Sequence, residues 1–463
     1  MKKALSLVLA LTLVFALTAC GGGGGDKSTE YSGPSYAELK VGEDYTDLTA
    51  ELRVISHRTD LIDNTFVKYV EKFNKLYPNI KISYEGITDY NGDMTTRLSS
   101  SNWGDICMIP TTILLPDLGL YFHPLCALSE IENDYNFATN RQFDGTVYGI
   151  PSTGNAQGII YNKAVAEQAG YTADEKELES NSNLKPLPKT PDEFIQFLKD
   201  IKDKTDAIPL YTNFAAGWTM TAWDAYISGG ATADPEWTNI TMPQTKDPFA
   251  DRGDGTGPYA VYKILYDVVS QGLVEESPTA TDWEGCKPMI NKGEIGCMVL
   301  GSWAIIQMQE AGPNADDISY MPFPITINGT QYASAGADYC YGVNNSISED
   351  NKIASMLYIK WLSESSNFAY DQGGVPVLKS QPYPETLSAF DGIELVEDAP
   401  APTELSTLQA DVNRESELSL NSDQTHVQRI VEAVVTGNET FEDIIADWNS
   451  RWNSAVDRYA PQS

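Results

Sequence analysis

Hydrophobic positions in the first part of the chain predict a strand–helix–strand unit. A short strand is indicated at 52–56, and alternating apolar side chains indicate a second strand at 80–84. Between them, four apolar residues recur at helical spacing, namely Phe66, Val70, Phe73 and Tyr77. Because strands joined through a helix usually pair in parallel, the unit favours an α/β fold with mainly parallel sheets flanked by helices.

The segment around Ile295–Leu300 has the pattern of a buried strand between two turns. The apolar run is nearly unbroken, as in strands covered on both faces of a sheet, and the turns are at Lys292-Gly293 and Gly301-Ser302. A helix is predicted over 303–310. Trp303 therefore stands where a strand gives way to a helix, the edge at which open α/β sheets bind ligands. A core filler at this position remains the alternative.

Two other segments bear on the division into lobes. The small, glycine-bearing stretch 152–156, which is flanked by strand-like pieces, has the pattern of a crossover, and 336–343 is predicted as a strand that carries one acid. A chain of 463 residues is too long for one small core and suits two lobes. We predict a first lobe formed by 46–153 plus 318–343 and a second lobe formed by 154–317 plus 344–463.

The first residues have the pattern of a lipoprotein signal peptide. Lys2-Lys3 and the apolar run Leu5–Leu17 precede Leu17-Thr18-Ala19-Cys20, which resembles a bacterial lipobox. We interpret 1–19 as the signal peptide, Cys20 as the lipidation site and 20–45 as a flexible tether. An ordinary signal peptide with a chance cysteine is the alternative. The expected location is the extracellular face of the bacterial cell membrane, and no later run is long and apolar enough to span a bilayer.

The composition is that of an acidic globular protein. Hydrophobic residues make up 42% of the chain, and the formal net charge is −34. Such a surface repels polyanions, so neither nucleic acid nor an anionic membrane surface is an expected partner.

The sequence does not indicate a metal site or a cofactor. Beyond Cys20 there are five scattered cysteines, at positions 107, 126, 286, 297 and 340. They lack metal-ligand spacing, and the three histidines form no cluster with them. We expect buried free thiols, with a Cys286–Cys297 bridge as an alternative, and neither a metal nor a cofactor. Nucleophile-elbow, P-loop and metalloprotease motifs are also absent.

Aromatic and polar residues at predicted strand ends are the candidate ligand contacts. Tryptophans offer flat apolar surfaces, and the loop 57–60 combines hydrogen-bond donors and acceptors. Helix capping by Asp60 and a solvated Arg58 would explain that loop equally well. Asp338 stands between apolar neighbours and needs partners, either backbone groups or ligand hydroxyls. The candidate set is His57, Arg58, Asp60, Asn155, Trp218, Trp223, Trp303, Asp338, Tyr339 and Gly373, the last in a turn that brings bare backbone to the surface.

Several motifs, in order along the chain, resemble those of extracellular solute-binding lipoproteins of ABC importers. The resemblance is to the carbohydrate-binding group, family 1, which is similar to maltose-binding protein. The segments that carry it are Phe73–Ile80, the crossover from Tyr148 to Lys163, Thr190–Phe194, and Lys292–Met298 with Gly301-Ser302-Trp303. Each motif alone is loose, but their order and spacing together are specific.

The resemblance implies a two-lobe, periplasmic-binding-protein-like fold with a ligand cleft between the lobes and hinge closure on binding. It implies that Trp303 faces a sugar and that the 57–60 loop, Asn155 and Asp338 contact it. The chemistry of the candidates agrees, because flat aromatics cover the C–H faces of a sugar while carboxylates, amides and arginine bind its hydroxyls.

The predicted function is therefore non-catalytic capture of a carbohydrate, in particular an oligosaccharide, and its delivery to the permease subunits of an ABC transporter by a monomeric protein. A surface glycoside hydrolase is one alternative, because 65 acidic residues make some carboxylate pair inevitable. A binding protein for a peptide or polyamine is another. No segment reads as a hydrolase scaffold, and the aromatic richness and Arg58 favour a sugar.

Overall fold

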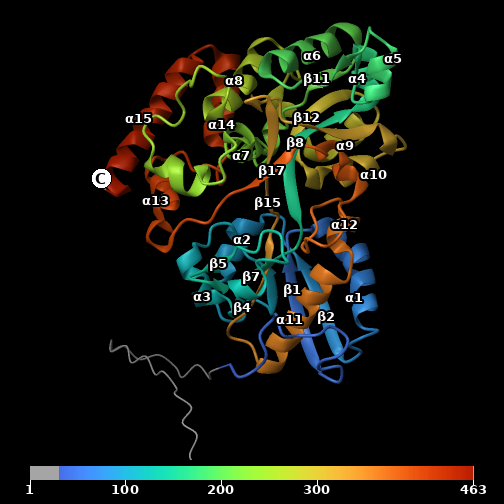
Figure 1. Ribbon diagram of the computed structural model, residues 1–463, viewed down its shortest axis with the longest axis vertical. Coiled ribbons are helices and arrows are strands. Elements are labelled where there is room, and N and C mark those ends of the chain that lie inside the picture. Colours follow the sequence, from blue (N-terminus) through green and yellow to red (C-terminus); the bar gives the residue numbers. More distant parts are fainter. Residues whose placement is uncertain (1–30, 462–463) are drawn as a thin grey trace, which may run out of the picture. The chain divides into compact units, whose positions relative to one another are not determined.

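The computed structural model describes residues 31–461. The predicted signal peptide, Cys20 and the glycine-rich part of the tether lie outside the described residues. Over 31–461, no helix combines the length and the apolar composition that a membrane span requires. The chain from Pro34 onward forms one compact unit, which contains two lobes, each built on its own sheet (Figure 1).

The first lobe contains a five-stranded sheet. Its strand order is β2 (Ile80–Gly86), β1 (Ala50–Ser56), β3 (Ile106–Met108), β16 (Cys340–Val343) and β7 (Gly149–Pro151). β1 pairs in parallel with both β2 and β3, which confirms the predicted strand–helix–strand unit. The helices of this lobe are α1 (Val67–Phe73), α2 (Tyr90–Arg97), α3 (Leu118–Tyr121), α11 (Glu349–Glu364) and α12 (Phe368–Asp371). A small sheet of β4 (Cys126–Ala127), β6 (Thr146–Val147) and β5 (Gln142–Phe143) lies at its side.

The second lobe contains a seven-stranded sheet that is mixed rather than mainly parallel. Its main strands are β11 (Ile208–Leu210), β12 (Ile295–Gly301), β8 (Gly154–Asn162), β15 (Thr330–Ala337) and β14 (Thr326–Ile327), with β13 (Ile318–Pro322) on β8 and β17 (Glu394–Glu397) on β15. β8 is antiparallel to β12, β13 and β15, while β11–β12 and β15–β17 are parallel pairs.

β12 is buried along its whole length, as its apolar run predicts. Met298 and Leu300 belong to one hydrophobic cluster, and Cys297 and Val299 belong to another. Both faces of the strand are thus covered. All five described cysteines are buried and free, so Cys286 and Cys297 are not bridged.

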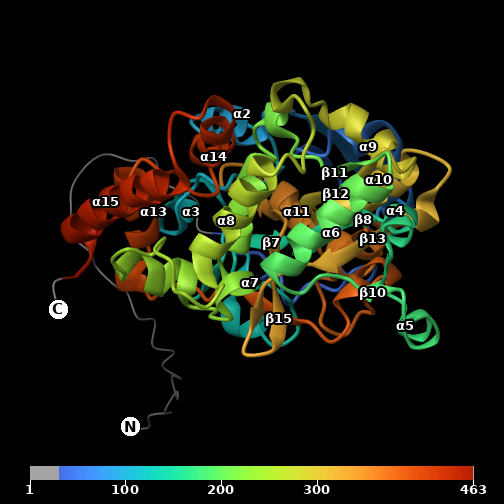
Figure 2. The ribbon, with the colours of Figure 1, turned by 90° about the horizontal axis from the view of Figure 1, so that it is seen from above.

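Helices cover the second sheet, and some of them lie beyond it on one side of the lobe. The helices are α4 (Lys163–Ala169), α5 (Glu175–Ser180), α6 (Pro191–Lys204), α7 (Gly229–Thr232), α8 (Gly257–Ser270), α9 (Trp283–Asn291), α10 (Ile305–Glu310), α13 (Leu408–Glu415), α14 (Thr425–Thr436) and α15 (Phe441–Tyr459). Seen from above, α13 and α15 lie together on the side away from α4 and α5 (Figure 2). A further short strand pair, β9 (Tyr171–Thr172) with β10 (Lys185–Pro186), encloses α5 in the insert 171–189.

Three segments cross between the lobes, and all of them meet at Gly154. The first crossover joins β7 to β8, and the second joins β15 to β16. The third follows α12, and its first part contacts Gly154 through Val375 before the chain pairs with the first lobe again at Val377–Lys379 and then crosses. Gly154 pairs with Ala337 of the second crossover and forms two backbone hydrogen bonds with Val375 of the third, at 2.9 and 2.7 Å. A Cβ atom at Gly154 would lie 2.0 Å from the ring of Phe137, so no side chain fits at this junction.

The lobe boundaries predicted from the sequence are wrong for 318–337, for 349–364 and for α12, which belongs to the first lobe. Residues 318–337 form β13, β14 and β15, and both β13 and β15 pair with β8 of the second lobe. Residues 349–364 form α11, which packs on β1 and β16 of the first lobe. The partner of a strand lies far away in the sequence, so local patterning shows that these elements exist without showing which sheet they join.

Part of the segment predicted as a tether is folded. Tyr36 and Leu39 are buried, and the backbone N–H of Tyr36 donates to the carbonyl of Leu125 at 2.8 Å. Lys360 of α11 donates to the carbonyl of Tyr36 at 3.2 Å, and its ammonium lies 4.6 Å from the centre of the Tyr36 ring. The first lobe therefore begins near residue 34 rather than 46.

Candidate ligand-binding cleft

The polar centre of the cleft lies where the crossovers meet the end of β1. His57 follows β1, Asp338 lies in the second crossover, and Asn155 lies on β8. The Nε2 of His57 is 3.5 Å from one carboxylate oxygen of Asp338, and the Nδ2 of Asn155 donates to the other oxygen at 3.1 Å. The fold thus brings together three candidates that are separated by up to 281 positions.

Asp338 is held as an anion in this position. Burial raises the pKa of its carboxyl, but the hydrogen bond and charge of His57, the charge of Arg58 and the hydrogen bond from Asn155 outweigh that effect, so the pKa is lower than usual. The side chain of Asp338 remains 23% exposed. An accessible carboxylate with free acceptor capacity is suited to binding ligand hydroxyls.

Arg58 is tied to the two segments that border this centre. It donates to Asp60 from Nε at 2.9 Å and from Nη2 at 2.7 Å, and Nη2 also donates to the Gln372 side chain at 2.9 Å. Burial raises the pKa of Asp60, and the Arg58 hydrogen bonds and charge lower it below its usual value. The pair is fixed in space and partly exposed, which suits it to contact a ligand.

Two tyrosines hold the imidazole of His57. The Tyr339 ring lies 4.4 Å from that of His57, and the Tyr90 ring lies 5.8 Å away in an edge-on arrangement. Tyr90 is fixed because its hydroxyl donates to the carbonyl of Met108 and accepts from the N–H of Met108, both at 2.8 Å. Burial and the charge of Asp338 raise the pKa of Tyr339 to about 12, so its hydroxyl stays neutral. Tyr90 was not predicted, because its helical position gives no sign of a cleft.

Three tryptophans from separate segments form an aromatic cluster in the second lobe. The ring centres of Trp218 and Trp303 are 5.6 Å apart, those of Trp283 and Trp303 are 5.8 Å apart, and those of Trp218 and Trp283 are 4.9 Å apart. Trp218 is 46% exposed, and the other two are partly exposed. Trp283 was not predicted as a site residue, because nothing in the sequence around the first residue of α9 indicates a ligand contact.

A hydrogen-bond network fixes the loop that carries Trp218. The backbone N–H of Thr212 donates to the buried carboxylate of Glu275 at 2.9 Å, and the N–H of Ala215 donates to the hydroxyl of Thr281 at 2.8 Å. The N–H of Asp282 donates to the hydroxyl of Tyr211 at 2.9 Å. These bonds join the loop after β11 to the start of α9, which brings Trp218 against Trp283.

The aromatic cluster and the polar centre are joined through Ser302. This residue directly precedes Trp303, and its hydroxyl accepts from the N–H of Ala156 at 3.1 Å and lies 3.5 Å from the side-chain oxygen of Asn155. Asn155 in turn binds Asp338. The segment that carries Trp303 therefore adjoins the polar side chains of Asn155 and Asp338.

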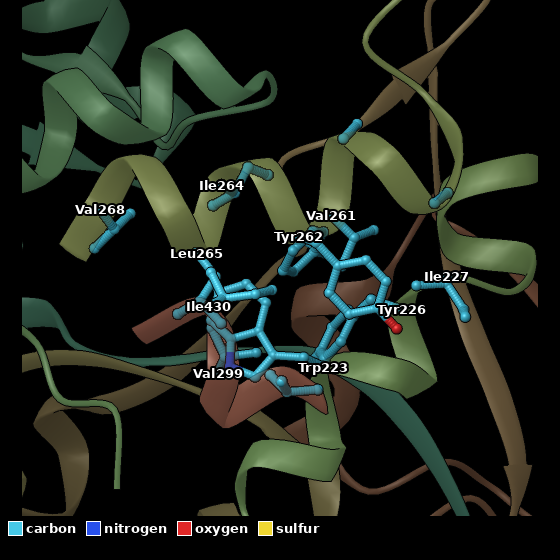
Figure 3. Close-up of a cluster of buried hydrophobic side chains, with 14 of the residues drawn as sticks. Trp223, Tyr226, Ile227, Val261, Tyr262, Ile264, Leu265, Val268, Val299 and Ile430 are labelled. Carbon is cyan, nitrogen blue, oxygen red and sulfur yellow. The ribbon is translucent and has the colours of Figure 1, made fainter. Parts of the chain in front are cut away.

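Two of the predicted site residues do not face the cleft. Trp223 is 2% exposed and packs in the core of the second lobe among Tyr262, Leu265 and Ile430 (Figure 3). The sequence did not show that the short helix Met220–Tyr226 directs Trp223 into the core. Gly373 is buried too, and a Cβ atom there would lie 3.1 Å from Ile306 and 3.2 Å from Thr386. The neighbouring Gln372, rather than bare backbone, reaches Arg58.

The sequence is similar to a known family model and to a curated sugar-binding protein. The family model described as bacterial extracellular solute-binding protein matches residues 59–367. The multiple sugar-binding protein of Streptococcus mutans is 25% identical over 336 residues, which cover 68% of this chain and 72% of that protein.

Solved structures show closer similarity. BlMnBP1 from Bifidobacterium animalis subsp. lactis, a binding protein of an ABC transporter in complex with mannobiose, is 42% identical, with a TM-score of 0.87 over 92% of this chain and 99% of that one. BlMnBP2 of the same organism, a manno-oligosaccharide-specific solute-binding protein in complex with mannotriose, is 39% identical, with a TM-score of 0.86 over 93% of this chain and 100% of that one. The chain, with this two-lobed fold, belongs to the bacterial extracellular solute-binding protein family.

Proposed function

We propose that this protein captures a short manno-oligosaccharide between its lobes and delivers it to the permease subunits of an ABC importer. The identities of 42% and 39% to two proteins described in complex with mannobiose and mannotriose support the ligand class. Binding without catalysis agrees with membership of the solute-binding family.

The observation that carries the proposal is the contact between Ser302 and Asn155. Ser302 directly precedes Trp303, and Asn155 donates to Asp338, which supports a site that combines the indole with this polar pair. A sugar ring offers an apolar face and a rim of hydroxyls, and this junction supplies a matching surface for each. Peptides and polyamines lack that combination of a flat apolar face with a surrounding ring of hydroxyls.

Calorimetric titration with mannobiose and mannotriose tests the proposal, with maltotriose, a peptide and spermidine as controls. We expect binding of the manno-oligosaccharides and a rise in melting temperature, because ligand at a hundred times its Kd stabilises the folded state by about 2.7 kcal/mol. Prolonged incubation should release no mannose. A response to spermidine or the peptide alone would contradict the ligand class, and release of mannose would contradict binding without catalysis.

We also propose that the mature protein is anchored to the outer face of the cell membrane through lipid on Cys20. The support is the charged start, the apolar run and the Leu17–Cys20 motif that follows. In cells that express the full chain, radiolabelled palmitate should appear in the wild-type protein and not in Cys20→Ala. Equal labelling of both proteins would refute the assignment.

A further inference from the structure

A second part of the cleft lies away from the tryptophans. It is a cavity of about 640 Å³ between the lobes, lined from the first lobe by the loops 111–115 and 139–141 and from the second lobe by Asp398, Gln409 and Asn421. None of the residues that line it is aromatic. A ligand in this cavity would be bound by hydrogen bonds rather than by stacking.

Arg141 faces this cavity as an unpaired cation. Its Nε is buried without a hydrogen-bond partner, and among the described residues no carboxylate forms an ion pair with its guanidinium. Burial lowers the pKa of Arg141, which reflects the cost of holding the charge away from water. Donors left unsatisfied in this way bind an incoming acceptor favourably.

Two acidic residues line the same cavity, and neither has a cationic partner within ion-pair distance among the described residues. Glu397 accepts from the hydroxyl of Thr139 at 3.4 Å, and Asp398 accepts from the hydroxyl of Thr238 at 3.1 Å. An anionic ligand would satisfy Arg141 but meet these acids, and a cationic ligand would do the reverse. A neutral polyol offers acceptors to the guanidinium and donors to the carboxyl groups, so it fits both.

The cavity adjoins a second one that reaches Gln157, a neighbour of Trp303. A neighbouring cavity of about 330 Å³ is lined by Gln157 and shares Asn140, Asp398 and Asn421 with the larger one. A Cβ atom at Gly301 would lie 2.6 Å from the indole Nε1 of Trp303 and 3.0 Å from the side-chain oxygen of Gln157, so these two side chains meet over Gly301. One groove thus leads from Gln157, whose side chain lies beside that of Trp303, to Arg141.

The wall that carries Asn421 is held rigidly. The N–H of Asn421 donates to the buried carboxylate of Asp224 at 2.7 Å, and Asp224 also binds His426 and Tyr262. Glu417, Ser419 and Asn421 all have positive φ, at 57°, 54° and 60°. Such backbone is costly for residues other than glycine and persists where surrounding contacts fix it, often at binding sites.

We propose that the groove from Gln157 to Arg141 is a second sugar subsite, in which Arg141 and Asp398 bind the hydroxyls of an oligosaccharide unit that a disaccharide on the tryptophan cluster does not reach. The inference rests on the proposed function and extends it to a preference for ligand length. A disaccharide fills the tryptophan end alone, while each added unit extends along the groove.

The test compares mannobiose, mannotriose and mannotetraose by calorimetry on the mature protein. The wild type should bind the longest sugar more tightly than mannobiose by at least tenfold. Arg141→Met keeps the length of the side chain and removes its donors, so it should abolish most of that difference while changing mannobiose affinity less than twofold. Asp398→Asn tests the opposite wall and should reduce the difference in the same direction. Arg458→Met is the control, because this arginine is exposed on α15 and paired with Glu415.

The outcomes separate the two proposals. A wild type that binds none of the three sugars would overturn the proposed function and the subsite with it. Binding with no length preference, or an equal loss for all three sugars in Arg141→Met and Asp398→Asn, would overturn the subsite alone. Melting temperatures within a few degrees of the wild type show that the variants are folded. If Arg141→Met falls outside that range, the affinities of Asp398→Asn test the subsite instead.

Discussion

Asp338 in the second crossover accepts a hydrogen bond from Asn155 of β8, with an Nδ2–Oδ1 distance of 3.1 Å. The same carboxylate lies 3.5 Å from His57 at the end of β1. One acidic group thus touches a strand of each lobe. A change at Asp338 is expected to affect both ligand binding and the connection between the lobes.

The first prediction concerns Asp338→Asn. The neutral amide loses the charge that attracts His57 and half of its acceptor capacity, so affinity for mannotriose should fall at least tenfold in calorimetry. Asp316→Asn, at an exposed position in the second lobe, is the matched control and should bind like the wild type.

The difference in stability between the wild type and the same variant should depend on pH. Because its partners lower the pKa of Asp338 in the folded state, the carboxylate contributes stability above its unfolded pKa of about 3.9 and loses it as the pH falls through the lower folded value. The melting temperature of the wild type should exceed that of Asp338→Asn at neutral pH, and the gap should shrink below pH of about 4. A constant gap would argue against a lowered pKa.

The second prediction contrasts two tryptophans. Trp303→Ala should weaken mannotriose binding at least tenfold with little loss of stability, because Trp303 is partly exposed at the cleft. Trp223→Ala should instead lower the free energy of unfolding by about 3–5 kcal/mol, as expected when a buried aromatic is truncated. Chemical denaturation and calorimetry on both variants check this. Unchanged affinity in a folded Trp303→Ala variant would refute its role.

The third prediction follows from Asp398. Burial and the nearby charges of Glu397 and Asp234 raise its pKa to about 6, although a hydrogen bond from Thr238 opposes the shift. The folded state therefore holds this proton more tightly than the unfolded state, so the contribution of Asp398 to stability falls as the pH rises between about 4 and about 6.

Asp398→Asn should relieve this loss, by at most about 3 kcal/mol at neutral pH and by little at pH of about 4. Melting temperatures of the two proteins across this range are the measurement. A variant that is less stable than the wild type at pH 7 by the same amount as at pH 4 would contradict a raised pKa. Exposed Asp316→Asn again serves as the control.

The fourth prediction concerns the N-terminal segment. Tyr36→Ala should destabilise the first lobe by about 3 kcal/mol, because the ring is fully buried against Lys360 and Tyr135. Tyr45→Ala, at a 43% exposed ring in the same segment, should leave the melting temperature nearly unchanged. If both variants had the melting temperature of the wild type, residues 34–45 would be part of the tether rather than of the first lobe.

The sequence predicted the parts of the fold that depend on local patterning. The parallel pair β1–β2 and the doubly covered strand β12 followed from the spacing of apolar residues. The placement of β13 and β15 on β8 did not, because strand pairing depends on residues more than a hundred positions apart.

The candidate site shows the same division. His57, Asn155 and Asp338 were found because they follow strands or interrupt apolar runs near predicted crossovers. Trp283 and Tyr90 were missed because each begins a helix, where nothing local distinguishes a side chain that meets a distant ring. Trp223 was misjudged for the converse reason, since composition alone does not tell a buried tryptophan from an accessible one.

The meeting of the three crossovers at Gly154 restricts how the lobes can move. Separate connections would allow the lobes to slide, twist and bend independently, but Gly154 is hydrogen-bonded to Val375 and paired with Ala337, so the three segments are joined side by side here as a narrow ribbon. A ribbon of this kind bends readily across its thin direction and resists shear in its plane. We therefore expect the lobes to move by close to a single rotation, so that a sugar bound at either end of the groove would favour the same closure.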